Sequence, residues 1–187
     1  MPILRSLAAL LIFCLTSAWP LPAAAWQIEI KEVGGGAQYT TDFSLHRHNL
    51  QSTGTLAYLA TPLWQNASLR LEGRLEGQLC KFWNYSSGME MALTPALRLY
   101  LQGGSPCAPT LYGEVGVGPS YNTLRINEMG ESFNFLSFAG LGLRLPLWNA
   151  MSLDLGYRIR HISNAGMDDA NAGVSSHQFL LELGFQY

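Results

Sequence analysis

The chain has 187 residues, with 11 Lys and Arg against 13 Asp and Glu, and its formal net charge is −2. A chain of this length is typical of one domain. The near-neutral balance excludes the strongly basic surface typical of nucleic-acid binding proteins, so we expect no nucleic-acid partner.

The N-terminal residues 1–25 read as a secretory signal peptide. Arg5 is the only charge before an apolar core at 7–15, and the small residues Ala23, Ala24 and Ala25 suit a cleavage site. The exported domain is then 26–187. It has no apolar run of about 18 residues, the length of a spanning helix. The exported chain is therefore either a soluble protein or a membrane β-barrel.

The rest of the chain shows the period-two alternation of strands with two different faces. The first alternating run is WQIEIKEV at 26–33, and a weaker run lies between Ser52 and Leu63. No segment has a convincing helical period. Six clearer runs bring the expected number of strands to eight: 68–79, 89–101, 111–118, 133–147, 151–159 and 177–187.

The two faces of these strands distinguish a membrane barrel from a soluble sandwich or barrel. One face is almost continuously Leu, Met and Phe, and the other is charged. An eight-stranded barrel has an interior that side chains can fill, so paired charges can face inward while the apolar face meets lipid. The C-terminal Phe185 and Tyr187 resemble the end of bacterial outer-membrane proteins. We therefore predict an all-β fold, an eight-stranded antiparallel transmembrane β-barrel in the bacterial outer membrane. The charges expected inside are Arg70, Glu72, Arg74, Glu76, Asp154 and Arg158.

Loop lengths predict the orientation of this barrel. Outer-membrane barrels have short periplasmic turns and longer extracellular loops. The short connections at 64–67 and 148–150 are expected in the periplasm, and the longer ones at 119–130 and 164–174 outside. The stretch 102–109 is long for a periplasmic turn.

The proline and cysteine residues lead to two further expectations about the strands. Pro95 cannot donate to a closed ladder, so we expect a bulge there. Cys80 and Cys107 are expected near opposite ends of the barrel. Because a disulfide needs Cα atoms within about 7 Å, we expect none between them.

The segment RHISNAG contains the candidate site. By strand parity, Arg158 and Arg160 point into the barrel, whereas His161 and Ser163 point outward at the level of the outer leaflet. Residues i and i+2 of a strand share one face, and histidine can act as the base that activates serine. A polar His and Ser on an apolar face, where ester-bearing lipids lie, would suit an esterase. The alternative is that they are only the polar residues common at interfacial strand ends.

The residues HISNAG, near the outward end of the penultimate strand, resemble the signature of the lipid A 3-O-deacylase (PagL) family. The resemblance implies that His161 is the general base and Ser163 the nucleophile. It implies hydrolysis of the ester-linked 3-hydroxyacyl chain at position 3 of lipid A. Asn164 and Gly166 match the positions expected to bind the oxyanion, where donors stabilise negative charge. The following Asn-x-Gly of the family is matched by Asn171 and Gly173.

One position departs from the family pattern. The family has a glutamate that orients the histidine, and here that position is Ser175. Ser175 can accept a hydrogen bond from imidazole but carries no charge, and Asp168 or Asp169 is an alternative third member.

The resemblance also sets the expected partners, which are lipopolysaccharide or lipid A and outer-membrane lipids. No cofactor and no metal is expected, because the metal-like spacing of His46 and His48 has no nearby carboxylate or cysteine. A homo-oligomer stays open. The alternative function is a non-catalytic small barrel with a structural or adhesin-like role.

Overall fold

The computed structural model describes residues 29–44, 49–102, 108–126, 128–129, 131–148, 150–167 and 172–187. These residues form strands joined by turns and loops, and none of them lies in a helix long and apolar enough to cross a bilayer. The strands are β1 (Glu32–Asp42), β2 (Leu50–Gln65), β3 (Leu69–Asn84), β4 (Gly88–Leu101), β5 (Thr110–Asn122), β6 (Phe133–Pro146), β7 (Met151–Ser163) and β8 (Val174–Gln186).

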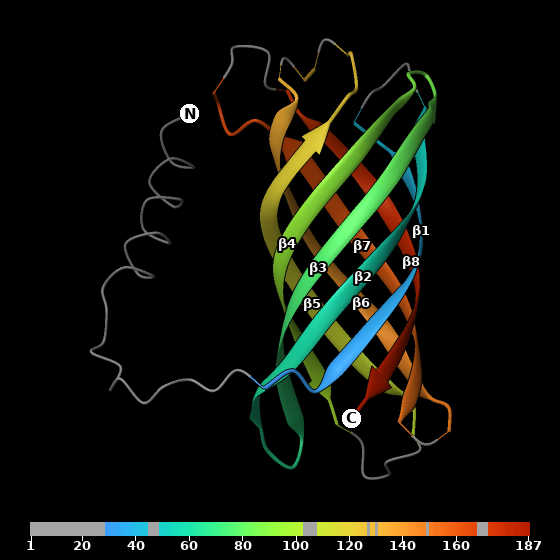
Figure 1. The fold of residues 1–187 in the computed structure, drawn as a ribbon, viewed down its shortest axis with the longest axis vertical. Helices are drawn as coiled ribbons and strands as arrows, with labels where there is room; N and C mark the ends of the chain where they lie inside the picture. Colours follow the sequence, from blue (N-terminus) through green and yellow to red (C-terminus); the bar gives the residue numbers. More distant parts are fainter. Residues whose placement is uncertain are drawn as a thin grey trace, which may run out of the picture.

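The strands close into one barrel (Figure 1). Each strand pairs antiparallel with its neighbours in sequence, and β1 pairs with β8 from Glu32 opposite Gln186 to Asp42 opposite Ser176. A closed barrel satisfies its backbone groups between strands, which is the condition for crossing lipid without helices. The eight-stranded antiparallel barrel expected from the sequence is confirmed.

The first strand begins later than its alternation indicates. WQIEIKEV was the expected strand, but Glu29 to Lys31 precede β1, which runs from Glu32 to Asp42. Three consecutive glycines in β1 have no side chains, so they hide the alternation. The register requires them, because a Cβ on Gly36 would lie 2.0 Å from the carbonyl oxygen of Leu181.

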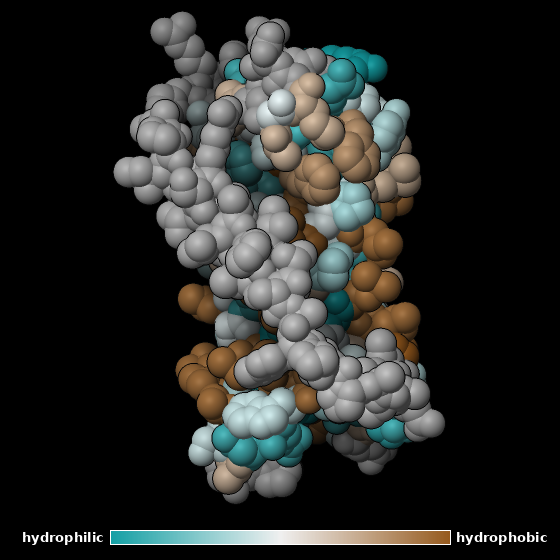
Figure 2. Space-filling view, turned by 90° about the vertical axis from the view of Figure 1, so that its left-hand side faces the viewer, coloured by the Kyte–Doolittle hydropathy of each residue, from teal (hydrophilic) through white to brown (hydrophobic). Residues whose placement is uncertain are grey.

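Side chains alternate between the barrel interior, or lumen, and the outer surface, or lipid-facing wall. In β4 every second residue from Glu90 to Tyr100 is buried, and those between them are exposed. Figure 2 shows brown hydrophobic side chains along the wall and teal hydrophilic ones toward both ends. This apolar band is typical of a membrane barrel. Exposed side chains of the wall include Leu75, Leu79, Met91, Leu93, Leu97, Val115, Leu141, Leu155, Leu181 and Leu183.

The lumen is filled by a network of buried ion pairs, as the sequence predicts. Arg98 lies at its centre, with Nη1 2.6 Å from Oδ2 of Asp154 and Nη2 2.9 Å from Oε2 of Glu182 and 2.8 Å from Oε2 of Glu114. All four side chains are fully buried. Such pairs are tolerated in a low-dielectric interior only with dense hydrogen bonding. Further pairs in the lumen are Arg74–Glu76, Arg74–Glu182, Arg144–Glu32, Arg144–Asp154, Arg158–Glu76, Arg158–Glu114 and Arg160–Glu90.

An apolar layer covers the end of the lumen at which β7 ends and β8 begins. Strand residues near this end pack there with Leu124, Ile126 and Met129 from the segment between β5 and β6, all with less than a tenth of their surface exposed. We call this end of the barrel the loop end, and the other, where β1 begins and Tyr187 lies, the terminal end (Figure 1). The layer consists of Leu50, Phe82, Ala92, Leu124, Ile126, Met129, Leu136, Ile162 and Val174.

The bulge expected at Pro95 is wrong. Pro95 pairs in regular register with Leu75 of β3. On the β5 side, pairing is interrupted between Ala92 and Ala96 but resumes without an inserted residue. The register shift lies instead in β2, between Pro62 and Trp64. A proline whose missing N–H falls in a gap of the ladder needs no extra residue.

Cys80 is a free thiol buried in the lumen, where its Sγ accepts a hydrogen bond from Nε2 of Gln38 at 2.7 Å. Cys80 lies near the loop end of β3, as expected from the sequence. Cys107 lies outside the described residues.

Candidate active site on the barrel wall

The end of β7 places His161 and Ser163 on the lipid-facing wall. The residues between and before them, Ile162 and Arg160, are buried in the lumen at 2% and 1% exposure. His161 and Ser163 are half-buried on the opposite face, in line with the exposed Ile159. The parity assumed from the sequence therefore holds to the last residue of the strand.

His161 contacts Ser175 of the neighbouring strand β8. The two residues are direct register partners, and Nδ1 of His161 lies 2.9 Å from Oγ of Ser175. Directly opposed residues of an antiparallel pair have Cβ atoms about 5 Å apart, so a ring nitrogen and a short hydroxyl can meet. The sequence position of the expected third member is thus the position that contacts the ring.

Ser175 is itself held by the end of the first strand. Its backbone N–H donates to Oγ of Ser44 at 2.9 Å, and its carbonyl oxygen accepts from the N–H of Phe43 at 3.0 Å. These bonds tie the backbone that carries the hydroxyl to the residues that follow β1.

Gly173 lies against the outer edge of the imidazole ring. Its φ is +68°, and a Cβ there would lie 2.7 Å from Cε1 and 2.9 Å from Nε2 of His161. Glycine is therefore required both by backbone conformation and by space. Its N–H donates to the carbonyl of Glu128 at 3.1 Å, which ties the residue before β8 to the segment before β6.

A tight turn follows Ser163. Asn164 is 1% exposed, and its Oδ1 accepts the N–H of Gly166 at 2.9 Å. Ala165 and Gly166 both have positive φ, 57° and 84°. This is an Asx turn, in which a side-chain oxygen replaces a backbone acceptor. Asn164 therefore shapes the turn from the lumen side, and the N–H of Gly166 already has an acceptor.

A second polar pair lies one register step nearer the terminal end. The Tyr157 hydroxyl is 2.7 Å from Nδ1 of His177, and the ring of Phe43 packs against that imidazole with centroids 4.5 Å apart. His177 is half-buried on the wall side of β8. Its partner Tyr157 appears in the sequence only as one more apolar member of the wall, so the contact is not visible before folding.

Several residues singled out in the sequence lie outside the described part of the chain. These are His46, His48, Asp168, Asp169 and Asn171. Among the residues that are described, no group of three or more His, Cys, Asp or Glu side chains could hold a metal ion.

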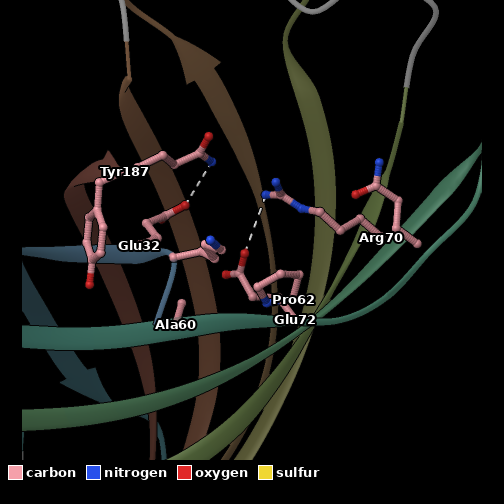
Figure 3. Close-up of a pocket in the computed structure, with 9 residues that line it drawn as sticks. Glu32, Ala60, Pro62, Arg70, Glu72 and Tyr187 are labelled. Atoms are coloured by element: carbon pink, nitrogen blue, oxygen red, sulfur yellow. Dashed lines mark hydrogen bonds and ion pairs between the residues drawn. The ribbon is translucent and has the colours of Figure 1, made fainter. Parts of the chain in front are cut away.

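A cavity of about 220 Å³ opens at the terminal end of the lumen (Figure 3). There Arg70 points toward Glu72, with Nη2 3.5 Å from Oε2, and Gln186 donates to Glu32 at 3.0 Å. Gln186 lies roughly 36 Å along β8 from Ser175, at about 3.3 Å per residue. This cavity is therefore separate from the His161 site.

The model of the family described as "Lipid A 3-O-deacylase (PagL)" matches residues 33–183, which include the end of β7 and the start of β8. The chain belongs to the lipid A 3-O-deacylase (PagL) family. Lipid A deacylation in the bacterial outer membrane is therefore the activity and the location of the family to which this barrel belongs.

Solved structures of outer-membrane barrels share the fold. The crystal structure of the outer membrane enzyme PagL is 19% identical with a TM-score of 0.57, covering 79% of this chain and 97% of that chain. Neisserial surface protein A (NspA) is 15% identical with a TM-score of 0.58, covering 83% and 96%. Ail, the attachment invasion locus protein of Yersinia pestis, is 13% identical with a TM-score of 0.52, covering 85% and 100%. These identities establish the fold alone. Comparison with curated protein sequences gave no match.

Proposed function

We propose that this PagL-family barrel hydrolyses the ester-linked 3-hydroxyacyl chain at position 3 of lipid A, with Ser163 as nucleophile and His161 as general base. The observation that carries the proposal is the contact between His161 Nδ1 and Ser175 Oγ, 2.9 Å apart on the lipid-facing wall. This contact orients the imidazole of His161 on the strand face that it shares with Ser163, and we expect the ester groups of outer-leaflet lipids at this level.

The contact with Ser175 is compatible with the tautomer of His161 that the reaction needs. When Nδ1 carries the proton and donates it to Ser175 Oγ, Nε2 keeps its lone pair. Nε2 can then accept the proton of Ser163 as Oγ attacks the ester carbonyl carbon. Cα atoms of His161 and Ser163 are about 6.6 Å apart along the strand, a spacing that the two side chains can bridge.

The reaction then proceeds in two halves. Collapse of the tetrahedral intermediate breaks the bond to the sugar oxygen, which takes the proton from Nε2 of His161 and leaves as the 3-hydroxyl of the glucosamine. The acyl chain stays on Ser163 as an ester. Water, activated by the same imidazole, releases the fatty acid and regenerates the serine.

Asn164 and Gly166 remain our candidates for supporting the oxyanion. The N–H of Gly166 donates to Oδ1 of Asn164 in the structure. It would serve the oxyanion by exchanging this acceptor for the substrate oxygen, or by sharing its hydrogen between both. The turn also fixes the backbone immediately after the nucleophile, which is the preorganisation that such sites need.

The deciding experiment is mass spectrometry of lipid A from cells that express the wild type, Ser163→Ala or His161→Ala. We expect loss of one 3-hydroxyacyl chain only with the wild type. Heat-modifiable migration on gels confirms that each variant is a folded barrel in the outer membrane. Unchanged lipid A with a folded wild-type barrel would instead favour the non-catalytic role, structural or adhesin-like.

We also propose that residues 1–25 are a signal peptide removed on export. N-terminal sequencing of the protein from outer membranes should begin at Trp26. A start at Met1 would contradict this.

A further inference from the structure

Strand β6 carries one hydroxyl on an otherwise apolar wall. Ser137 is half-buried on the lipid-facing side, between Phe135 and Ala139. A hydroxyl facing hydrocarbon without a good partner costs free energy, and polar side chains at such positions are commonly functional. The other residues of β6 on this face are Phe133, Leu141, Leu143 and Leu145.

The register places Ser137 beside the proposed catalytic residues. Ser137 is the direct partner of His161, and Phe135 is the direct partner of Ser163. Ser137 and Ser175 therefore flank His161 on its two sides, at the same level of the wall. That level is one side-chain pair, about 6.6 Å of strand, nearer the membrane midplane than Ser163.

The two flanking serines have different partners. Ser175 Oγ is 2.9 Å from the imidazole nitrogen, a good hydrogen bond. Ser137 Oγ donates to the backbone carbonyl oxygen of His161 at 3.4 Å, which is long for a hydroxyl donor. The oxygen of Ser137 also has lone pairs that can accept a proton from another group. Among the contacts of the described residues, Ser137 is thus the flanking serine whose oxygen can still accept a hydrogen bond.

An acyl chain that enters the membrane from Ser163 would bring its 3-hydroxyl close to the Ser137 hydroxyl. An acyl chain whose ester carbon lies at Ser163 runs from the interface toward the midplane, past the level of His161 and Ser137. A 3-hydroxyacyl chain carries its hydroxyl two carbons beyond the ester carbonyl, so this group enters the same level. Since hydrocarbon offers it no hydrogen-bond partner, the protein surface must supply one.

We propose that Ser137 binds the 3-hydroxyl of the acyl chain that is cleaved, and so makes the site selective for 3-hydroxyacyl over plain acyl esters. The inference rests on the proposed function, because it requires the ester to be attacked at Ser163. A site built around a substrate hydroxyl discriminates against the analogue that lacks it, since a polar group of the site is then left unpaired.

The test compares two synthetic lipid A precursors that differ only at position 3, with a 3-hydroxyacyl or the matching unsubstituted acyl chain. We expect the wild type to prefer the hydroxylated lipid about tenfold in kcat/KM, as one hydrogen bond of this kind allows. In Ser137→Ala, hydrolysis of the hydroxylated lipid should fall until the two rates agree within about twofold.

Two control variants distinguish recognition from a structural role. Ser137→Thr keeps the hydroxyl and should keep most of the preference. Ser137→Ala combined with Ala139→Ser moves the hydroxyl two residues toward the midplane and should not restore it. An unchanged preference in Ser137→Ala, or an equal loss on both lipids, overturns the inference.

Failure of the proposed function would look different. If the wild type hydrolyses neither lipid, or Ser163→Ala hydrolyses both, the deacylation mechanism itself is wrong and the role of Ser137 falls with it. If Ser163→Ala is inactive but Ser137→Ala keeps the wild-type preference for the hydroxylated lipid, the mechanism stands. This inference alone is then rejected.

Discussion

A serine occupies the position that orients the imidazole in this site. Ser175 Oγ reaches Nδ1 of His161 at 2.9 Å and can fix the orientation of the ring. It cannot stabilise the imidazolium that forms when His161 takes the proton of Ser163, because a hydroxyl carries no charge. An acidic third member supplies that stabilisation, and its loss lowers turnover while leaving residual catalysis.

Substitutions at Ser175 should therefore separate orientation from charge. Ser175→Ala is expected to lower kcat for lipid A roughly tenfold, because Nδ1 loses its acceptor. Ser175→Glu is expected to raise kcat above the wild type, since a carboxylate stabilises the imidazolium. Steady-state kinetics on lipid A in mixed micelles give both values. An alanine variant as active as the wild type would show that this hydroxyl does not act through His161.

Gly173 offers a second test of the site, because a single added Cβ atom there would displace the His161 ring. Gly173→Ala forces a residue with φ of +68° to carry a Cβ within 2.7 Å of His161 Cε1. The ring must move, and a displacement of about 1 Å can cost about 100-fold in rate. The matched control is Gly77→Ala on β3, where an added Cβ has no neighbour within 4 Å among the described residues. Its activity should stay unchanged, and equal losses in both variants would contradict the steric argument.

At the scale of the strand, each element presents one face to lipid and the other to the lumen. Along β4, Met89 lies near the loop end and Leu97 near the middle of the strand, both exposed on the wall. The cost of a charge on the lipid-facing side of a barrel depends on its depth, because water and headgroups can solvate it only near the interfaces.

We expect Leu97→Arg to lower the free energy of unfolding by about 2–4 kcal/mol, and Met89→Arg by about 0–1 kcal/mol. Urea titration of the protein folded into phosphatidylcholine vesicles measures both. Similar costs at the two positions would mean that the membrane does not lie as the apolar band indicates.

The strands also show which parts of the fold are readable from the sequence. Alternation identified seven strands because their side chains differ on the two faces. It misplaced β1, where Gly34 to Gly36 carry no side chains. The extra residue near Leu63 was not predicted either, since a bulge there depends on how β2 and β3 pair and leaves no local pattern.

The candidate site was readable to a similar extent. Parity alone put His161 and Ser163 on the wall, and the family pattern indicated position 175. The packing of Gly173 against the ring and the place of Ser137 beside it depend on the register between strands. Register is a long-range property, so short patterns do not specify it.

For the whole molecule, the lumen network supplies much of what holds the wall in place. Arg98 joins carboxylates from three other strands, Glu114 of β5, Asp154 of β7 and Glu182 of β8. Removing one partner of a buried network leaves uncompensated charge, which is more costly than the loss of the pair itself.

Arg98→Met should accordingly lower the free energy of unfolding by about 3–5 kcal/mol. Lys31→Met is the control, because Lys31 lies at the terminal end and its ion pair with Glu29 is exposed on both sides. Its cost should stay below about 1 kcal/mol. The same vesicle titration compares them, and equal costs would argue against the network as the main support.

The filled lumen also has a consequence for the membrane around it. Charged side chains pack its middle, and the apolar layer from Leu50 to Val174 covers the loop end. The described residues thus leave no open channel for ions along the middle of the lumen. We therefore expect the protein to leave the conductance of its membrane unchanged, however many copies the membrane holds.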